Sequence, residues 1–175
     1  YHAIANDHPI SFVYDNIYKQ EHREFSMVPY LLKENRNKWY VLGWYEKHQT
    51  YLTFALDRMS KVLIGNTLVK KRKDFDPEAI FKHSTGIMGG NNELMEMVIE
   101  VTEPICVLLE KHPMHPSQQT VKQLKDGIRV SMQVINSPEL ISQLLSFGKH
   151  LTIVKPASLR KKLREELEQM LNRNS

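Results

Sequence analysis

The 175-residue chain contains a single cysteine, Cys106, only seven glycines and no long apolar run. One cysteine excludes an intramolecular disulfide and a cysteine-based metal cluster. No window approaches the roughly 18 consecutive apolar residues that a membrane span requires. The start of the chain also lacks the charged and then apolar segment of a secretion signal. We therefore expect a cytoplasmic protein that does not associate with membranes.

The sequence motifs of common enzymes are absent as well. There is no Gly-x-Ser-x-Gly elbow, phosphate-binding glycine loop or zinc-protease helix. Cys106 lies in an apolar run and is interpreted as a packing residue rather than a catalytic thiol. His112 and His115 have a spacing that can chelate a metal on a helix, but Pro113 and Pro116 disfavour a regular helix, so we interpret this segment as a structured turn. We predict a protein that is not an enzyme and needs no cofactor or metal.

The net charge of +4 comes entirely from the first part of the chain. Residues 1–75 contain 12 basic and 8 acidic side chains, whereas residues 76–175 contain 12 of each. The run Lys70-Lys71-Arg72-Lys73 accounts for this excess. Such a run is usually a solvated strand end or linker face, and a role in steering anions is the alternative.

Hydrophobic periodicity predicts two domains, 1–75 and 93–175, joined by a linker at 76–92. Between residues 1 and 69 the period is two, and polar breaks separate about five short strands. Closing such strands into a small antiparallel barrel would remove exposed sheet edges. In the linker, Asp76-Pro77 predicts the start of a short helix, and the Gly/Asn cluster at 89–92 predicts its end.

The second domain is predicted to be α+β with ferredoxin-like order, strand-helix-strand-strand-helix-strand followed by a helix. Ser137-Pro138-Glu139 indicates a helix start, with a hydroxyl N-cap, a proline at the first helical position and an acid in the first turn. The expected elements are strand 95–101, helix 105–109, a hairpin of 121–124 and 128–134, a helix from 138, strand 151–154, and a final amphipathic helix with the apolar stripe Leu159, Leu163, Leu167, Met170 and Leu171.

Two strand motifs point to a known family. Trp39-Tyr40-Val41 is followed by Phe54-Ala55-Leu56-Asp57-Arg58-Met59. Their order and spacing resemble the signature of the WYL domain, named for its Trp-Tyr-Leu, here with Val41 in the third place. The second half, including His115-Pro116-Ser117-Gln118, resembles the C-terminal extension that often accompanies WYL domains in bacterial regulators. The resemblance implies an Sm- or SH3-like barrel, preceded by a helix whose tail lies around residues 2–5.

The resemblance also implies a function. It identifies the chain as the effector-sensing and dimerising part of a bacterial helix-turn-helix transcription regulator that acts as a homodimer. The sequence begins at Tyr1 rather than at a methionine, so we expect a fragment from which an N-terminal DNA-binding domain is missing. The implied effector is a nucleic acid or a nucleotide. The C-terminal α+β domain, which has no net charge and an apolar final helix, is our candidate for contacts between protomers.

The candidate ligand-binding residues are aromatic and basic. WYL domains are understood to bind ligands on a barrel face, which Tyr14, Tyr40 and Arg58 would line together with Trp39. Family members commonly have basic residues at the positions of Leu52 and Ala55, so Arg23 is a candidate substitute charge. The purely structural alternative places Trp39 and Phe54 in the core and makes Asp57-Arg58 a local ion pair. The predicted ligand-binding set is Tyr14, Arg23, Trp39, Tyr40 and Arg58.

Two other functions stay open at this point. One is an Sm-like module that holds single-stranded nucleic acid constitutively, without a switch. The other is an enzyme, which would require a turnover that depends on Cys106 or His115.

Overall fold

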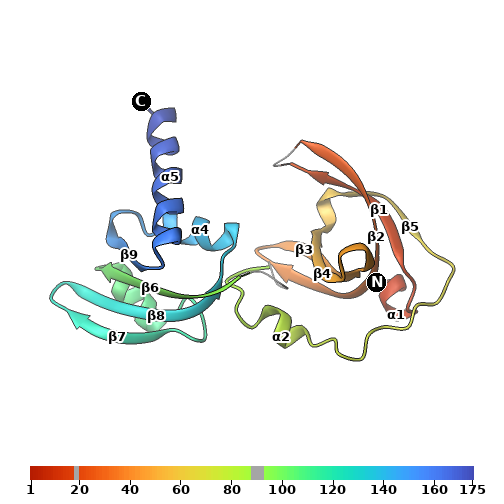
Figure 1. Cartoon of the computed structure of the whole chain (residues 1–175), viewed down its shortest axis with the longest axis horizontal. Helices are drawn as coiled ribbons and strands as arrows, with labels where there is room; N and C mark the ends of the chain where they lie inside the picture. The colour runs from red at the N-terminus through yellow and green to blue at the C-terminus, as the bar shows by residue number, and fades with distance from the viewer. Residues whose placement is uncertain (18–19, 88–92) are drawn as a thin grey trace. The chain divides into compact units, whose positions relative to one another are not determined.

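The computed structural model describes residues 1–17, 20–87 and 93–175 and divides into two compact units (Figure 1). The first unit is built around Tyr1–Lys82, and the second around the residues from 93 onward together with His83–Gly86. The predicted linker falls partly outside the described residues, since 88–92 are not described. Its described part contains α2 (Pro77–Phe81), where the Asp76 carboxylate accepts hydrogen bonds from the backbone N–H groups of Glu78 and Ala79. Within the described ranges, no helix is long and apolar enough to cross a membrane.

The first unit is a five-stranded antiparallel sheet that follows a short helix, as predicted. Short turns join consecutive strands, which forces neighbours in sequence to run in opposite directions. The turn between β2 and β3 has two central residues, Arg36 and Asn37, with φ of 50° and 59°, as in the type I′ turns that suit the twist of a hairpin. The elements are α1 (His2–Ala5), β1 (Ile10–Asn16), β2 (Glu21–Asn35), β3 (Lys38–Tyr45), β4 (Thr50–Ala55) and β5 (Met59–Ile64), with 3-10 turns η1 (Glu46–His48) and η2 (Leu56–Arg58).

The strand order is β4-β3-β2-β1-β5, so β4 and β5 lie at the two edges. Turn η2 connects them, but no hydrogen-bonded ladder between these two strands is found in the described residues, and the predicted closed barrel is therefore not established. On β5 one extra residue faces β1, where the register shifts near Lys61, whose φ is 51°. This is a β-bulge in an edge strand whose Val62, Leu63 and Ile64 are exposed.

The inner face of this sheet holds an aromatic core. The ring of Phe12 lies 5.0 Å from that of Phe54, and Phe54 lies 4.7 Å from Phe25, measured between ring centroids. Val41 and Met27 are buried with them. Edge-to-face and tilted ring pairs of this kind add to the free energy of burial.

Residues 65–76, which we call the strap, first bond to the segment before β1 and then cover part of the outer face of the same sheet. The strap follows β5 and has little regular secondary structure. Phe75 packs on Tyr30 with ring centroids 4.4 Å apart, and Arg72 lies over Trp44. Tyr30 and Trp44 are only 7% and 9% exposed. Burial also raises the pKa of the neighbouring Tyr51 to about 12.

The second unit has the predicted ferredoxin-like order. Its sheet runs β7-β8-β6-β9, and all neighbours are antiparallel. A Cβ at Gly127, the first residue of β8, would collide with the carbonyl of Val101, so glycine is required there. The elements are β6 (Leu94–Thr102), α3 (Ile105–Lys111), β7 (Gln119–Leu124), β8 (Gly127–Ile135), α4 (Pro138–Leu145), a 3-10 turn η3 (Gly148–His150), β9 (Leu151–Lys155) and α5 (Ala157–Arg173).

Helices and one sheet face enclose the core of the second unit. The predicted cap is present, because the Ser137 hydroxyl accepts a hydrogen bond from the Leu140 backbone N–H at 3.2 Å. His115 is buried, and its Nδ1 accepts from the Ser117 backbone N–H at 3.1 Å, which makes it part of a structured turn. Helix α5 buries Leu159 at its start, and its C-terminal half extends beyond the sheet (Figure 1).

Candidate functional site

A cleft with a volume of about 650 Å³ opens in the first unit, where the inner face of the sheet meets turn η1. Strand β2 contributes one wall, and the end of β3, turn η1 and β4 contribute the other. The rings of Phe25 and Tyr45 lie 5.6 Å apart between centroids. The residues that line the cleft are His22, Arg23, Glu24, Phe25, Tyr45, Lys47, His48 and Leu52.

Basic side chains dominate the polar lining of this cleft. Arg23 and Lys47 are positively charged, His22 and His48 add two imidazoles, and Glu24 is the only acid among the lining residues. Arg23 forms an ion pair with Glu21 at 2.7 Å, and its side chain is 60% exposed. An exposed ion pair contributes little to stability, so an anionic ligand can exchange for Glu21 at small cost.

Turn η1 holds two of these residues in place. The Glu46 carboxylate accepts hydrogen bonds from the Trp44 indole N–H and the Gln49 side-chain amide, both at 2.7 Å. Both hydrogen bonds lower the pKa of Glu46, and the bond from Trp44 has the larger effect. Gln49 closes the turn in the left-handed conformation, with φ of 49°. Lys47 and His48 are thereby presented at the rim of the cleft on a short, tied turn.

The predicted residue Arg23 lines this cleft, and Tyr14 lies behind it. Tyr14 is directly opposite Arg23 in the β1–β2 ladder and opposite Met59, the residue after Arg58, in the β1–β5 ladder. The structure therefore brings Tyr14 close to Arg23 on one side and to the η2 end of β5 on the other. The Tyr14 ring itself packs edge-on against Phe54 at 4.9 Å, within the inner core.

Trp39 and Arg58 belong to another corner of the first unit. Trp39, at the start of β3, is 54% exposed and so is not a core residue. The preceding residue, Lys38, forms an ion pair at 2.7 Å with Asp57, which precedes Arg58 in η2. The hydrogen bond from Lys38 lowers the pKa of Asp57. Arg58 is half-buried beside this pair.

Tyr40 faces the opposite side of the sheet. Its cross-strand partners are Lys33 and Ala55, and it alternates with Val41, which points into the inner core. The five predicted residues thus do not form one cluster: Arg23 and Tyr14 are associated with the inner face, Trp39 and Arg58 with the η2 corner, and Tyr40 with the outer face.

Sequence reasoning missed the other basic residues of the cleft. Residues 46–49 are recognisable as a polar break, but a turn motif alone does not show that Lys47 and His48 lie opposite Arg23. One signal does connect them. Leu52, where the family commonly has a basic residue, lines the same cleft as Arg23. The proximity of Leu52 and Arg23 agrees with the hypothesis that Arg23 supplies a substitute charge.

Comparison with known families now identifies the class of protein. Residues 1–64 match the WYL domain, and residues 93–171 match the WCX domain. The chain therefore contains a WYL domain followed by a WCX domain. No curated protein matches the chain significantly.

Two solved structures resemble this chain. One is described as a CRISPR Cas-related protein; it matches with a TM-score of 0.62 and 16% identity over 99% of this chain and 50% of the other. The other is proteasome accessory factor B/C (PafBC) of Arthrobacter aurescens, with a TM-score of 0.43 and 20% identity over 93% of this chain and 24% of that one. The chain thus spans half or less of the length of either structure, and the likeness to the CRISPR Cas-related protein concerns the fold.

Proposed function

We propose that this chain is the effector-sensing part of a helix-turn-helix transcription regulator, and that a nucleic acid or nucleotide binds in the cleft beside Arg23. The observation that carries the proposal is the convergence of Arg23 and Lys47 with the rings of Phe25 and Tyr45 around one opening. Leu52, where the family carries a cation, lies in the same lining. Arg23 supplies that charge from β2.

The chemistry of the cleft suits a phosphate attached to a base. The Arg23 guanidinium grips phosphate oxygens in a planar fork, and Lys47 adds a mobile point charge. Tyr45, at the rim, offers a ring on which a base stacks, and such stacking contributes about 1–3 kcal/mol per base. Two cations and one accessible ring favour a short or small ligand over a long polyanion, whose binding needs many phosphate contacts.

A sensor requires the ligand to favour one arrangement of the protein over another. A ligand with equal affinity for both arrangements shifts nothing, however tightly it binds. We propose that effector binding changes how a DNA-binding domain preceding this chain meets its operator, in a homodimer.

Helix α5 is the proposed contact between protomers. Leu167, Met170 and Leu171 are 48%, 51% and 67% exposed on its C-terminal half. Residues 160–164 carry four basic side chains, and residues 165–168 carry three acidic ones. Packing of two copies of α5 would bury the three apolar side chains in a shared stripe, while Lys161 stays paired with Glu165 and Arg164 with Glu168 within each helix.

Titration of the purified chain with the single-stranded oligonucleotide (dT)6 and with a cyclic dinucleotide tests the ligand assignment. We expect the R23A/K47A double variant to weaken binding of the preferred probe by at least about tenfold. The K122A/K125A variant removes the same charge from the second unit and is the matched control. Equal affinity of both double variants would show that the cleft is not the site.

A second measurement distinguishes the sensor from the alternative function, a module that binds single-stranded nucleic acid constitutively. A sensor joined to its upstream DNA-binding domain changes its operator affinity when the probe saturates the cleft. A passive module binds the oligonucleotide with no such change.

A further inference from the structure

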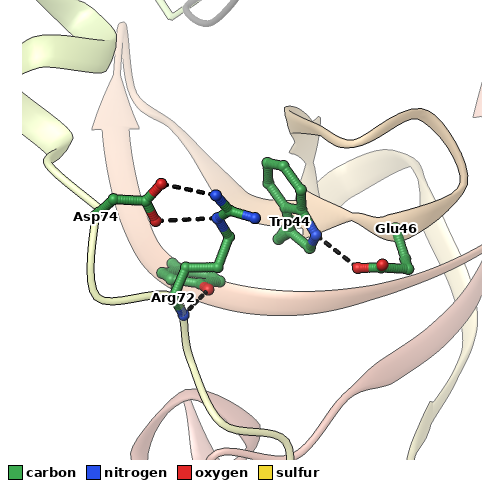
Figure 2. Close-up of polar contacts among 5 residues, drawn as sticks. Trp44, Glu46, Arg72 and Asp74 are labelled. Atoms are coloured by element: carbon green, nitrogen blue, oxygen red, sulfur yellow. Dashed lines mark hydrogen bonds and ion pairs between the residues drawn. The ribbon is translucent and has the colours of Figure 1, made fainter.

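The strap is fastened to the outer face of the first sheet by a small number of side-chain contacts. The Arg72 guanidinium lies 4.4 Å from the centroid of the Trp44 ring, and it forms an ion pair with Asp74 at 2.7 Å (Figure 2). The Arg72 backbone N–H donates to the Tyr30 hydroxyl at 2.7 Å. Lys71 forms an ion pair with Asp7 at 2.8 Å. Two members of the basic run are thus bound to the first unit, Arg72 to the sheet and Lys71 to the segment between α1 and β1.

The ring beneath Arg72 is tied in turn to the rim of the ligand cleft. The Trp44 indole N–H donates to the Glu46 carboxylate (Figure 2). Glu46 opens turn η1, whose next two residues, Lys47 and His48, line the cleft on the other side of the strand. Glu46 also attracts Arg72 electrostatically, which is one of the contributions that lower the pKa of Glu46.

Turn η1 therefore has two attachments, one to the cleft and one to the strap. The strap continues into α2 and then into the residues that lead to the second unit. A movement of η1 that separates Glu46 from Trp44 would also take the negative charge of Glu46 away from the vicinity of Arg72. Among these two carboxylates, the stacked guanidinium would then keep Asp74, which belongs to the strap itself.

We propose that turn η1 couples occupancy of the cleft to docking of the strap, so that an anionic ligand bound at Lys47 and His48 favours the undocked strap. The identity of the ligand in this inference rests on the proposed function. The connection between Glu46 and the strap does not depend on it. The direction follows from charge: a phosphate that draws Lys47 and His48 into the cleft also repels the adjacent Glu46 carboxylate. By linkage, a variant with a looser strap binds the ligand more tightly.

Amide hydrogen exchange of a peptide covering residues 69–74 measures docking of the strap. Without ligand, we expect Glu46→Ala and Arg72→Ala each to accelerate exchange of this peptide by about three- to tenfold, because local opening becomes easier. Lys73→Ala removes the same charge as Arg72→Ala from an exposed neighbour and serves as the matched control, with exchange unchanged. Unaltered exchange in Glu46→Ala would overturn the proposal, whatever the ligand is.

The second arm adds (dT)6 at saturating concentration. We expect faster exchange of the strap in the wild-type chain, little further change in Glu46→Ala, and tighter binding of (dT)6 by Glu46→Ala. Binding of (dT)6 without any change in strap exchange would overturn the coupling while leaving the ligand site intact. If (dT)6 and a cyclic dinucleotide both fail to bind, the proposed function fails, and the measurements on Glu46→Ala without ligand still decide whether η1 controls the strap.

Discussion

Tyr14 and Arg23 are directly opposite each other in the ladder between β1 and β2. Directly opposite residues of an antiparallel pair lie on the same face of the sheet. Their environments nevertheless differ: the Tyr14 ring is enclosed by Phe12, Phe25 and Phe54, whereas Arg23 lines the cleft. One pair of neighbours thus joins the core of the first unit to its candidate ligand site.

This difference separates a packing role from a binding role. We expect Arg23→Ala to weaken binding of (dT)6 by about tenfold, because a hydrogen-bonded charge is lost from the site. Tyr14→Phe should leave the affinity within about twofold, since its ring packing is kept. Fluorescence titration measures both dissociation constants. A larger loss with Tyr14→Phe than with Arg23→Ala would place the ligand on Tyr14.

Arg58 lies at the η2 corner, outside the lining of the cleft. The family resemblance nevertheless predicts that it acts in ligand binding rather than in stability, so its substitution tests whether the ligand reaches that corner. We expect Arg58→Ala to lower effector affinity while the melting temperature stays nearly unchanged, as is usual for substitutions outside a tightly packed core. Calorimetry and titration on the same sample give the two values. A large drop in melting temperature with intact binding would assign Arg58 a structural role in the η2 corner.

Salt dependence reports the number of phosphate contacts. The logarithm of the association constant for a single strand falls with the logarithm of salt concentration by about 0.7 per neutralised phosphate. We expect Lys47→Ala to reduce this slope by about 0.7. The measurement is a series of (dT)6 titrations between low and moderate salt, with Lys122→Ala as control. A flat slope in the wild-type chain would show that the cleft neutralises no phosphate of (dT)6.

The apolar stripe of α5 should control the oligomeric state. We expect the wild-type chain to be a dimer and the L167K/L171K variant to be a monomer, because burying two charges in the shared stripe is costly. Val121, which is 53% exposed on β7, provides a control: Val121→Lys should remain dimeric. Sedimentation velocity distinguishes the species. A dimeric L167K/L171K variant would show that another surface joins the protomers.

The tie between Trp44 and Glu46 should have a characteristic response to acid. Hydrogen bonds from Trp44 and Gln49 lower the pKa of Glu46 below its ordinary value of 4.5. Its stabilising contribution is therefore complete above pH 4.5 and is lost as the pH falls through the lowered pKa. The indole N–H resonance of Trp44 in NMR spectra should shift in this acidic range.

Trp39 supplies the internal reference for that titration. Its indole resonance should not follow the transition of Trp44, and Glu46→Gln should abolish the transition of Trp44. An unchanged Trp44 resonance between pH 6 and the onset of acid unfolding would contradict the assigned hydrogen bond.

Local patterns in the sequence were enough for most of the elements. The Ser137 cap and the hairpin of β7 and β8 depend on neighbouring residues, and both were predicted where the structure has them. The exposure of Trp39 was harder to foresee, because alternation shows which residues share a face but not how far the core extends along it. The strap was also misjudged in part: four consecutive cations suggested a solvated segment, yet Arg72 stacks on Trp44 of the sheet and Lys71 forms an ion pair with Asp7.

The candidate site depends on contacts between distant parts of the chain. Arg23 lies in strand β2 and Lys47 in turn η1, and only the folded sheet places them around one opening. Arg23 was proposed from a departure at Leu52, which gave a reason to seek a compensating charge. No comparable departure pointed to Lys47 or His48, so they emerged only from the structure.

The bulge at Lys61 bears on how this protein avoids self-aggregation. A regular edge strand exposes a row of amide and carbonyl groups on which a strand from a second molecule can add. The left-handed residue and its ammonium group interrupt that row in the middle of β5. A sheet with three apolar side chains at its rim can thus remain open on that side without recruiting foreign strands.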